Sequence, residues 1–238
     1  MAMVFPRPIE AVVFDMDGLL IDSETLYRDA LLAAAADTGQ PLPVSIFHTL
    51  IGAPIAQNRE TLLGFFGPDY DIEALFVEAS RRFHNEVDYE NILKAGVTEL
   101  LDRLETLGLP RAIATSSPHE AVQRHLGPSG LTLRFQAIIA RGDYIRGKPA
   151  PDPFLAAAAA LGIDPRACLA LEDSHNGVRA AHAAGMMTIM VPDLLEPTDE
   201  MHEKCVIVAD SLHRVLTLVD AHHLERGLSG VEEPDLQD

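Results

Sequence analysis

The stretch VVFDMDGLLIDSE at residues 12–24 is the most informative part of this sequence. An apolar run ends there in two carboxylates, Asp15 and Asp17, and Gly18 follows directly. On an extended strand, side chains two residues apart point to the same face. Two carboxylates held so close repel each other, and one takes up a proton unless a cation neutralises the site. The stretch indicates either a metal-binding strand end or a strand followed by an ordinary acidic turn.

The charge of the chain limits the partners that it can bind. Among 238 residues, 18 are Lys or Arg and 36 are Asp or Glu, so the formal net charge is −18. Affinity for phosphate backbones comes from clustered Lys and Arg, so we expect no binding to nucleic acid or to anionic membranes. The hydrophobic content of 47% is typical of a folded globular chain with one large or two modest domains.

The sequence also predicts a compartment. No apolar run is long enough to span a bilayer, and the opening MAMVFPRPIE is too short and too interrupted by proline for a secretory signal. The two cysteines, Cys168 and Cys205, do not form a disulfide framework. We therefore expect a cytoplasmic protein, and a monomer is the default expectation.

Strand-like and helix-like stretches alternate in the second half of the chain. Short apolar runs lie at 11–14, 111–115, 137–140, 168–172, 187–191 and 206–208. Helical patterns between the later runs lie at 118–126, 152–161, 176–184 and 211–224. Gly162 is a plausible end for the second of these helices. The alternation predicts an α/β fold with a parallel sheet that helices cover on both faces.

A long interval separates the first two strands. An ordinary crossover needs roughly a dozen residues or more, whereas this one runs from Asp15 to Arg111. The excess holds helical patterns at 23–37, 54–65 and 71–87, and a crossover helix at 96–107 follows. Ser23 is a possible N-cap for the first of these helices. We predict a helical insertion that emerges beside the acidic pair and could cover it.

Polar clusters follow four of the predicted strands or their loops. They are Asp15 with Asp17, then Thr115 with Ser116 and Ser117, then Lys148, and finally Glu172 with Asp173 and Ser174. Open parallel sheets bind ligands outside the carboxyl ends of their strands, so we expect all four clusters to converge on one edge. Each cluster alone has an ordinary interpretation, since hydroxyls and carboxylates often cap helices and a lone lysine is usually solvated.

The residue types in these clusters suit phosphoryl transfer. Carboxylates without a Cys or His partner are ligands that Mg²⁺ favours, together with water and substrate phosphate. A hydroxyl and an ammonium nearby would hold the anionic oxygens of a phosphoryl group. A carboxylate can act as the nucleophile and form an aspartyl-phosphate, while a second acid protonates the leaving oxygen.

The order and spacing of these motifs resemble the haloacid dehalogenase-like (HAD) hydrolase superfamily from about residue 9 to residue 210. The motifs that carry the resemblance are DMDG, ATSS, GKPAPDPF and LEDSHNGV. The family's architecture implies a Rossmann-like core with an inserted helical cap domain. On this division, residues 1–20 and 92–226 form the core, 21–91 form the cap and 227–238 form an acidic tail.

The resemblance also implies roles for single residues. Asp15 would be the nucleophile and a Mg²⁺ ligand, and Asp17 the general acid/base that offers its backbone carbonyl to the metal. The implied substrate-binding residues are Gly18, Thr115, Ser116 and Lys148, of which Thr115 and Lys148 bind the phosphoryl oxygens during catalysis. The implied remaining metal residues are Glu172 and Asp173.

Within the superfamily, several residues favour a sugar-phosphate phosphatase. The dehalogenases lack the second acid of the first motif, whereas Asp17 is present here. The similar β-phosphoglucomutase branch has a histidine where this chain has Tyr27. It also has an arginine soon after the glycine of the cap, where this chain has Ile55 after Gly52. Residues 20–90 contain no lysine for a phosphonate hydrolase's Schiff base. The alternatives are a phosphoglycolate phosphatase and a β-phosphoglucomutase-like mutase. Each of these activities takes a small phosphorylated molecule as its substrate.

Three other interpretations fit the residues less well. The stretch GDYIRGKP at 142–149 imitates a nucleotide P-loop, but Pro149 stands where a hydroxyl is required. A receiver-type signalling domain uses similar residues, yet it is about half as long and has no cap. The ten histidines show no spacing typical of a metal site, and those bordering the site, His119 and His175, favour a helix-start role.

Candidate specificity residues in the cap are Arg28, Asn58, Arg59, Arg81 and Arg82.

Overall fold

A six-stranded parallel sheet forms the core of the protein. The computed structural model describes residues 5–51, 53, 55–89 and 91–229. The strands are β1 (Ala11–Phe14), β2 (Arg111–Pro118), β3 (Ala137–Arg141), β4 (Cys168–Glu172), β5 (Met187–Met190) and β6 (Ile207–Val208). Their order is β3-β2-β1-β4-β5-β6, with every neighbouring pair parallel. The predicted α/β class is confirmed.

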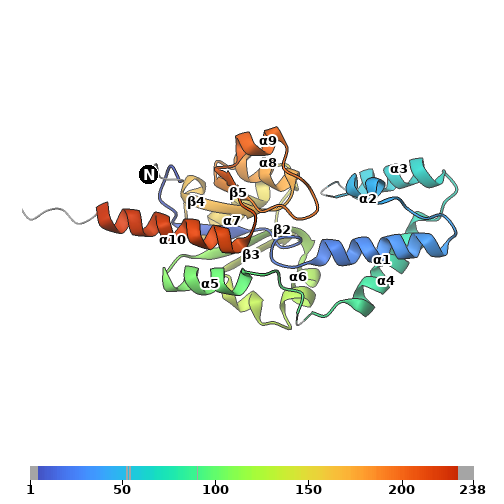
Figure 1. Ribbon diagram of the computed structural model, residues 1–238, viewed down its shortest axis with the longest axis horizontal. Coiled ribbons are helices and arrows are strands. Elements are labelled where there is room, and N and C mark those ends of the chain that lie inside the picture. Colours follow the sequence, from blue (N-terminus) through green and yellow to red (C-terminus); the bar gives the residue numbers. More distant parts are fainter. Residues whose placement is uncertain (1–4, 52, 54, 90, 230–238) are drawn as a thin grey trace, which may run out of the picture.

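Helices cover both faces of this sheet (Figure 1). They are α5 (Val97–Thr106), α6 (His119–Leu126), α7 (Asp152–Leu161), α8 (His175–Ala183), α9 (Asp199–Lys204) and α10 (Leu212–Ser229). Val12 and Phe14 of β1 pack in one apolar cluster with α5 and α10, whereas Ala11 and Val13 pack in another with α7 and α8. Alternate residues of a strand point to opposite faces, so β1 is buried on both.

The second apolar cluster is rich in alanine, which brings α7 close to the sheet. Ala157 and Ala158 of this helix are fully buried against strand alanines. Gly162 ends α7 in the left-handed conformation, with φ of 71°. This is the C-terminal signal that the sequence predicted.

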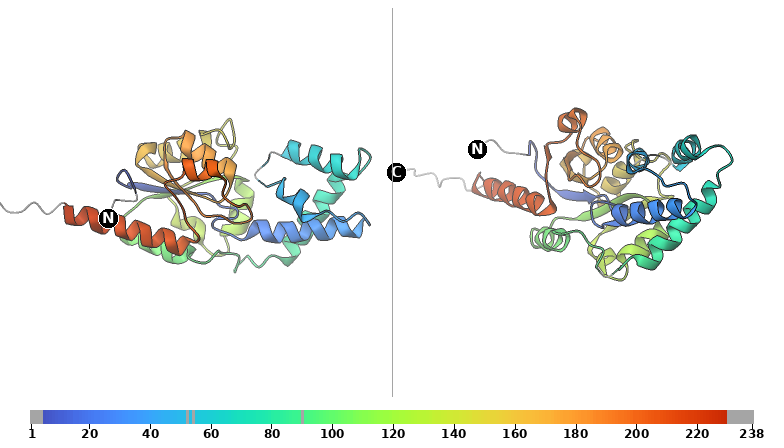
Figure 2. Two further views of the ribbon diagram at one scale, coloured as in Figure 1. Left: turned by 45° about the horizontal axis from the view of Figure 1, so that its top comes forward. Right: turned by 45° about the vertical axis from the view of Figure 1, so that its right-hand side comes forward.

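Four helices lie to one side of the sheet (Figures 1 and 2). These cap helices are α1 (Ser23–Asp37), α2 (Val44–His48), α3 (Ile55–Phe66) and α4 (Ile72–Glu86). They share their own apolar cluster, which includes Leu31, Phe47, Leu62 and Leu75. The predicted domain limits at residues 21–91 stay a prediction, but these helices bury a core separate from the sheet's.

The two chain segments that join the cap helices to the sheet run side by side. The amide of Asp22 donates to the carbonyl of Ile92 at 3.0 Å, and the amide of Lys94 donates to that of Leu20 at 3.0 Å. Ile21 and Leu93 form an antiparallel bridge between the same segments. The connection is therefore a paired, two-stranded one and not two independent linkers.

Some local predictions were wrong. Ser23 begins α1 instead of capping it, because its hydroxyl donates to Asp17; the cap position is Asp22, without a side-chain cap bond. The strand β2 continues beyond Thr115 to Pro118 after a register shift. Helix α2 was not predicted. The helix α10 runs to residue 229, so three residues of the predicted tail are helical, and residues 230–238 lie outside the described part.

No helix in the described ranges has both the length and the apolar character needed to cross a membrane.

Candidate active site

Residues from two loops and one strand end meet at the carboxyl edge of the sheet. Asp15 follows β1, Glu172 ends β4, and Lys148 lies between β3 and α7. The Nζ atom of Lys148 donates to Oδ1 of Asp15 and to Oε1 of Glu172, each at 2.5 Å. The Lys148 side chain is only 7% exposed and that of Glu172 is 0% exposed. Residues more than 130 positions apart in sequence thus form one buried ionic cluster.

Three carboxylates of this cluster could hold a metal ion. Single oxygen atoms of Asp15, Glu172 and Asp173 lie within 4.8 Å of one another, and all three residues are buried. The donor set contains only oxygen, which suits a hard divalent cation such as Mg²⁺. Asp17 is not in this group, and its predicted contact through the backbone carbonyl stays a prediction.

The protonation of these carboxyls supports a cation at the site. Burial, together with the charges of Glu172 and Asp17, raises the pKa of Asp15 to about 7, although Lys148 acts in the opposite direction. Burial and the charge of Glu172 raise the pKa of Asp173 well above its usual range. Burial alone would lower the pKa of Lys148, but Asp15 and Glu172 raise it, so the ammonium stays charged. One ammonium cannot neutralise three carboxylates, and a divalent cation would replace the protons that the cluster otherwise takes up.

The Asp17 carboxylate is held between the sheet and the first cap helix. Ser23 of α1 donates to its Oδ1 at 2.8 Å, and Ser117 of β2 donates to its Oδ2 at 2.7 Å. Two hydroxyl donors on opposite sides restrict the orientation of the carboxylate. Sequence reasoning missed both partners, because Ser117 belongs to the distorted end of β2 and Ser23 was interpreted as a cap.

Gly18 has a position that no other residue could occupy without strain. Its φ is +81°, and a Cβ added there would lie 2.3 Å from Oδ2 of Asp173. The predicted substrate-binding role of Gly18 stays a prediction. The loop after β1 approaches the Asp173 carboxylate closely at this glycine.

Thr115 and Ser116 line the other side of the site. Thr115 is buried, and its Oγ1 accepts from the amide of Ser117 at 3.0 Å. Tyr144 donates to the Thr115 carbonyl at 3.1 Å and so ties the loop after β3 to β2. Ser116 faces the pocket next to Lys148. The three-hydroxyl run therefore does not cap α6, whose cap position is Pro118.

Glu172 is held by the start of α8. Its Oε2 accepts from the amides of Asp173 and Ser174 at 3.2 Å and 3.1 Å, and from the Ser174 hydroxyl at 3.0 Å. Ser174 also caps α8 by accepting from the amide of Gly177 at 3.1 Å. The capping interpretation therefore holds for Ser174, and the capping residue in turn orients Glu172.

A second acidic group shares Asp173 with the first. Glu24, Asp173 and Asp193 each offer an oxygen within 4.8 Å of the others. Burial raises the pKa of Glu24 to about 8, with smaller contributions from Asp17 and Asp15. Asp193 forms an ion pair with Lys94, in the segment that leads back from the cap helices. The sequence pattern did not single out Asp193 or Lys94, since neither belongs to a motif.

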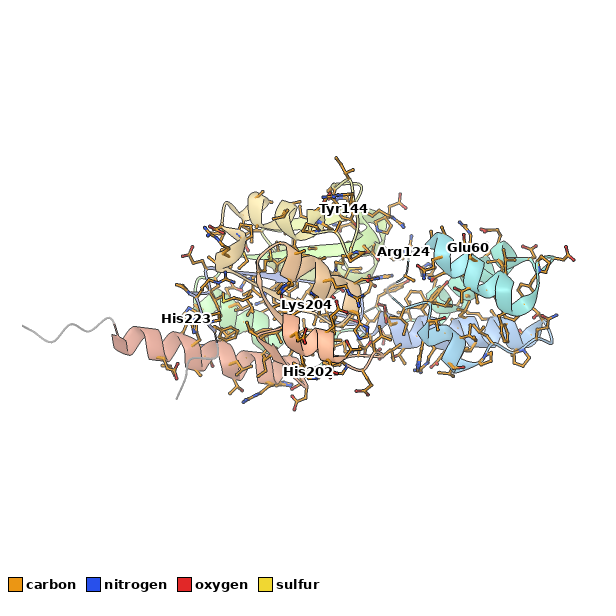
Figure 3. The ribbon with its side chains drawn as sticks, turned by 90° about the horizontal axis from the view of Figure 1, so that it is seen from above. Glu60, Arg124, Tyr144, His202, Lys204 and His223 are labelled. Carbon is orange, nitrogen blue, oxygen red and sulfur yellow. The ribbon has the colours of Figure 1, made fainter. Side chains whose placement is uncertain are left out.

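A pocket of about 960 Å³ opens over these residues, between the sheet edge and the cap helices. Asp17, Ser116 and Lys148 lie on its core side, whereas Asn58 lines its cap side. Figure 3 shows Arg124 between the two parts, with Glu60 on the cap side and Tyr144 on the core side. Arg124 donates to Nε2 of His84 at 3.0 Å, which links α6 to α4 across the same region.

The remaining candidates have structural partners outside this pocket. The four cap arginines form ion pairs on the helix surfaces, and none of them lines the pocket: Arg28 with Asp29, Arg59 with Glu73, Arg81 with Glu78, and Arg82 with Glu78 and Asp37. His119 contacts Asp143 at 2.8 Å at the start of α6. His175 contacts the carbonyl of Glu196 at 2.9 Å at the start of α8. Of the predicted specificity residues, only Asn58 reaches the pocket.

The fold and this site define a hydrolase class: a Rossmann-like sheet that presents buried carboxylates and a lysine beneath a helical cap. A family model described as haloacid dehalogenase-like hydrolase matches residues 9–185. The chain therefore belongs to the haloacid dehalogenase-like hydrolases, as its motifs predicted.

Individual relatives agree with this assignment. Hexitol phosphatase B of Escherichia coli is 34% identical over 196 residues, which cover 80% of this chain and 86% of the relative. A phosphorylated carbohydrates phosphatase of Thermotoga maritima is 30% identical over 190 residues, covering 76% and 84%. The crystal structure of CbbY from Rhodobacter sphaeroides in complex with phosphate is 25% identical and has a TM-score of 0.70, covering 89% of this chain and 99% of that one. The protein is thus an enzyme of the phosphatase class, and the receiver interpretation was wrong.

Proposed function

We propose that this enzyme hydrolyses small phosphomonoesters, above all sugar phosphates, through an aspartyl-phosphate on Asp15. The observation that carries the proposal is the cluster of Asp15, Lys148 and Glu172 on the floor of the pocket, with contacts of 2.5 Å. A buried carboxylate fixed by a buried ammonium is pre-organised to meet the phosphorus of a bound monoester.

The chemical steps are assigned to this chain's residues as follows. A carboxylate oxygen of Asp15 forms a bond to phosphorus while the bond from phosphorus to the leaving oxygen breaks. Asp17 donates a proton to that oxygen and then accepts one from the water that attacks the phosphoryl-aspartate. Lys148 and Thr115 stabilise the negative charge of the phosphoryl oxygens, and Ser116 and Gly18 help to bind the group. Free phosphate and the regenerated Asp15 complete the cycle.

We infer that Mg²⁺ binds the carboxylates of Asp15, Glu172 and Asp173, which fit it by donor type and by charge. When bound, it supplies positive charge for the phosphoryl oxygens. Asp17 would contribute its backbone carbonyl. Its side chain is oriented by Ser23 and Ser117, and because it lies outside the inferred metal-ligand group it is left for proton transfer.

Two alternative activities are a phosphosugar mutase and a phosphoglycolate phosphatase. A mutase must hold a second phosphorylated position and move protons on the cap side. At the two positions that distinguish the mutase branch, the pocket has Tyr27 and Ile55, which offer neither a cation nor a base at neutral pH. This composition favours hydrolysis. Phosphoglycolate phosphatase activity remains the runner-up, because a small acid phosphate would also reach Lys148.

The test is release of inorganic phosphate from p-nitrophenyl phosphate and from a panel of sugar phosphates and phosphoglycolate. We expect multiple turnovers with Mg²⁺, none with a chelator, and none for Asp15→Asn. Conversion of β-glucose 1-phosphate to glucose 6-phosphate, measured in parallel, should be absent. Turnover by Asp15→Asn at a near-normal rate would overturn the assigned nucleophile, and full activity in chelator would overturn the inferred metal.

A further inference from the structure

The cap side of the pocket is mainly apolar. Its apolar lining residues include Leu31, Phe47, Leu50, Ile55, Phe76 and Phe83, which come from α1 to α4 and their connections. A hydroxyl moved from water to such a surface loses its hydrogen bonds to water and gains no partner in exchange, which is unfavourable. A leaving group with many hydroxyls is therefore disfavoured against this wall, whereas a flat apolar ring face gains contact.

Apart from the Glu24 carboxyl described above, one polar group on the cap side, Asn58, has an oxygen without a hydrogen-bond partner in the described part of the chain. Asn58 lies on α3 and lines the pocket. Its Oδ1 atom is shielded from solvent and accepts no hydrogen bond from the part of the chain that the structure describes. A buried amide oxygen without a donor is rare in folded proteins, because its desolvation is not compensated. A ligand that carries an N–H or O–H would supply the missing donor.

His125 is a second unpartnered group, on the core side of the pocket. This residue of α6 is 6% exposed, and neither ring nitrogen has a partner within the described ranges. Its ring stacks on Tyr89 at 5.6 Å between centroids and meets the edge of Phe83 at 5.7 Å. Burial lowers its pKa, so the ring is neutral at pH 7 and has one donor and one acceptor. The aromatic contacts hold the ring in place without satisfying either nitrogen.

We propose that the leaving group of the substrate is an alcohol bearing a flat ring with at least one N–H or O–H donor, which packs on the apolar cap wall and hydrogen-bonds Asn58 and His125. Nucleoside 5′-monophosphates are representative of this class. The inference rests on the proposed phosphatase function and narrows it. The pocket volume of about 960 Å³ is at the upper end of the roughly 300–1,000 Å³ typical of small-molecule sites, so it accommodates a ring in addition to a sugar.

The first experiment compares kcat/KM for two substrate classes with the wild-type enzyme and Mg²⁺. Uridine 5′-monophosphate and phenyl phosphate carry a ring, whereas sorbitol 6-phosphate and glycerol 3-phosphate carry only hydroxyls. We expect kcat/KM for uridine 5′-monophosphate to exceed that for sorbitol 6-phosphate by about tenfold or more, because the ring adds a matched hydrogen bond and buried apolar area. A preference for the polyol phosphates would overturn this inference while leaving the phosphatase function intact. No phosphate release from any of the four would overturn both.

The second experiment separates the hydrogen bond from the ring contact. Asn58→Leu removes the acceptor and keeps a side chain of similar size. We expect kcat/KM to fall about tenfold for uridine 5′-monophosphate and to stay within twofold for phenyl phosphate, which has no donor. The control is Gln57→Leu, an exposed neighbour on α3 outside the pocket lining, which should change neither value. An equal loss on both substrates would contradict a hydrogen-bonding role for Asn58.

His125 is tested by a pair of variants. His125→Leu should lower kcat/KM for uridine 5′-monophosphate and His125→Gln should restore most of it, because glutamine again offers a donor and an acceptor. Gln123→Leu, at an exposed position of the same helix, is the control. Thermal unfolding of all variants checks the fold. If a folded His125→Leu enzyme kept its full preference for uridine 5′-monophosphate, His125 would have no part in substrate recognition.

Discussion

Burial and the neighbouring carboxylates raise the pKa of Asp15, so without a bound cation this carboxyl takes up a proton. The folded protein keeps that proton up to about pH 7, whereas an unfolded chain releases it near pH ~4. Over this interval the folded state binds more protons, so its stability falls as the pH rises. The loss should be complete once the pH passes the folded-state pKa.

We therefore expect a pH-dependent difference between the wild type and Asp15→Asn in chelator. The variant has no proton to lose at this position. Between pH 5 and 8 the stability of the variant should rise relative to that of the wild type. We expect a change of on the order of 2 kcal/mol in the free energy of unfolding, or about 5 °C in the melting temperature. Thermal unfolding in matched buffers measures the difference. A gap that stays constant with pH would show that Asp15 has an ordinary pKa in the folded protein.

Ser117 acts through Asp17, and its removal should affect the rate more than the binding. Ser117→Ala deletes the hydroxyl that donates to Asp17 at 2.7 Å. The carboxylate then loses one of its two orienting contacts, so we expect kcat to fall about tenfold with KM nearly unchanged. Ser129→Ala is the control, since Ser129 donates to the backbone carbonyl of Leu126 and does not line the pocket. A larger KM with an unchanged kcat would instead indicate that Ser117 binds substrate.

At the scale of elements, the turn after β1 determines how closely the acids approach. Gly18→Ala introduces a Cβ 2.3 Å from the Asp173 carboxylate, at a φ of +81°. We expect roughly 1–2 kcal/mol of lost stability from the left-handed backbone, and at least a hundredfold loss of activity from the displaced Asp173. Phosphate release and thermal unfolding check the two effects separately.

The control for this substitution is Gly39→Ala. Its φ is +77°, yet a Cβ there would meet nothing within 4 Å. It should lose a similar amount of stability and keep full activity. If both variants lost activity equally, backbone strain rather than the contact with Asp173 would be the cause.

The regular elements were predictable because their apolar periodicity is local. The sequence placed β1 at 11–14 and α1 at 23–37, as observed. Ser23 was misassigned because an N-cap and a donor to Asp17 look alike in sequence. The end of β2 was misassigned because its register shift depends on pairing with β3. Helix α2 has only five residues, too few for a helical period to be recognised.

The site was predictable where it follows strand ends and unpredictable where it depends on how the cap meets the core. Asp15, Lys148 and Glu172 converge because parallel strands share one carboxyl edge. Asn58 and His125 come to one pocket from different parts of the chain, and no motif connects them. Their relation depends on the packing of α1 to α4 against the core, which periodicity does not specify.

At the scale of the whole molecule, two separate apolar cores predict two regions of different stability. Leu62 is fully buried in the cap core and Leu101 in the sheet core. Each truncation to alanine should remove about 2–5 kcal/mol. We expect Leu62→Ala to speed hydrogen exchange in α1 to α4 while the strands stay protected, and Leu101→Ala to affect the strands. Uniform acceleration in both variants would mean that cap and core unfold as one unit.

The central claim is that Asp15 carries the phosphoryl group during turnover. The most direct measurement uses Asp17→Asn, which lacks the base for the second step and should accumulate phosphoenzyme. After mixing with substrate and Mg²⁺ and quenching in acid, peptide mass spectrometry should find a phosphoryl group on Asp15, and none in the double variant with Asp15→Asn. A phosphoryl group on another residue, or rapid phosphate release by Asp17→Asn with an unmodified Asp15, would contradict the account.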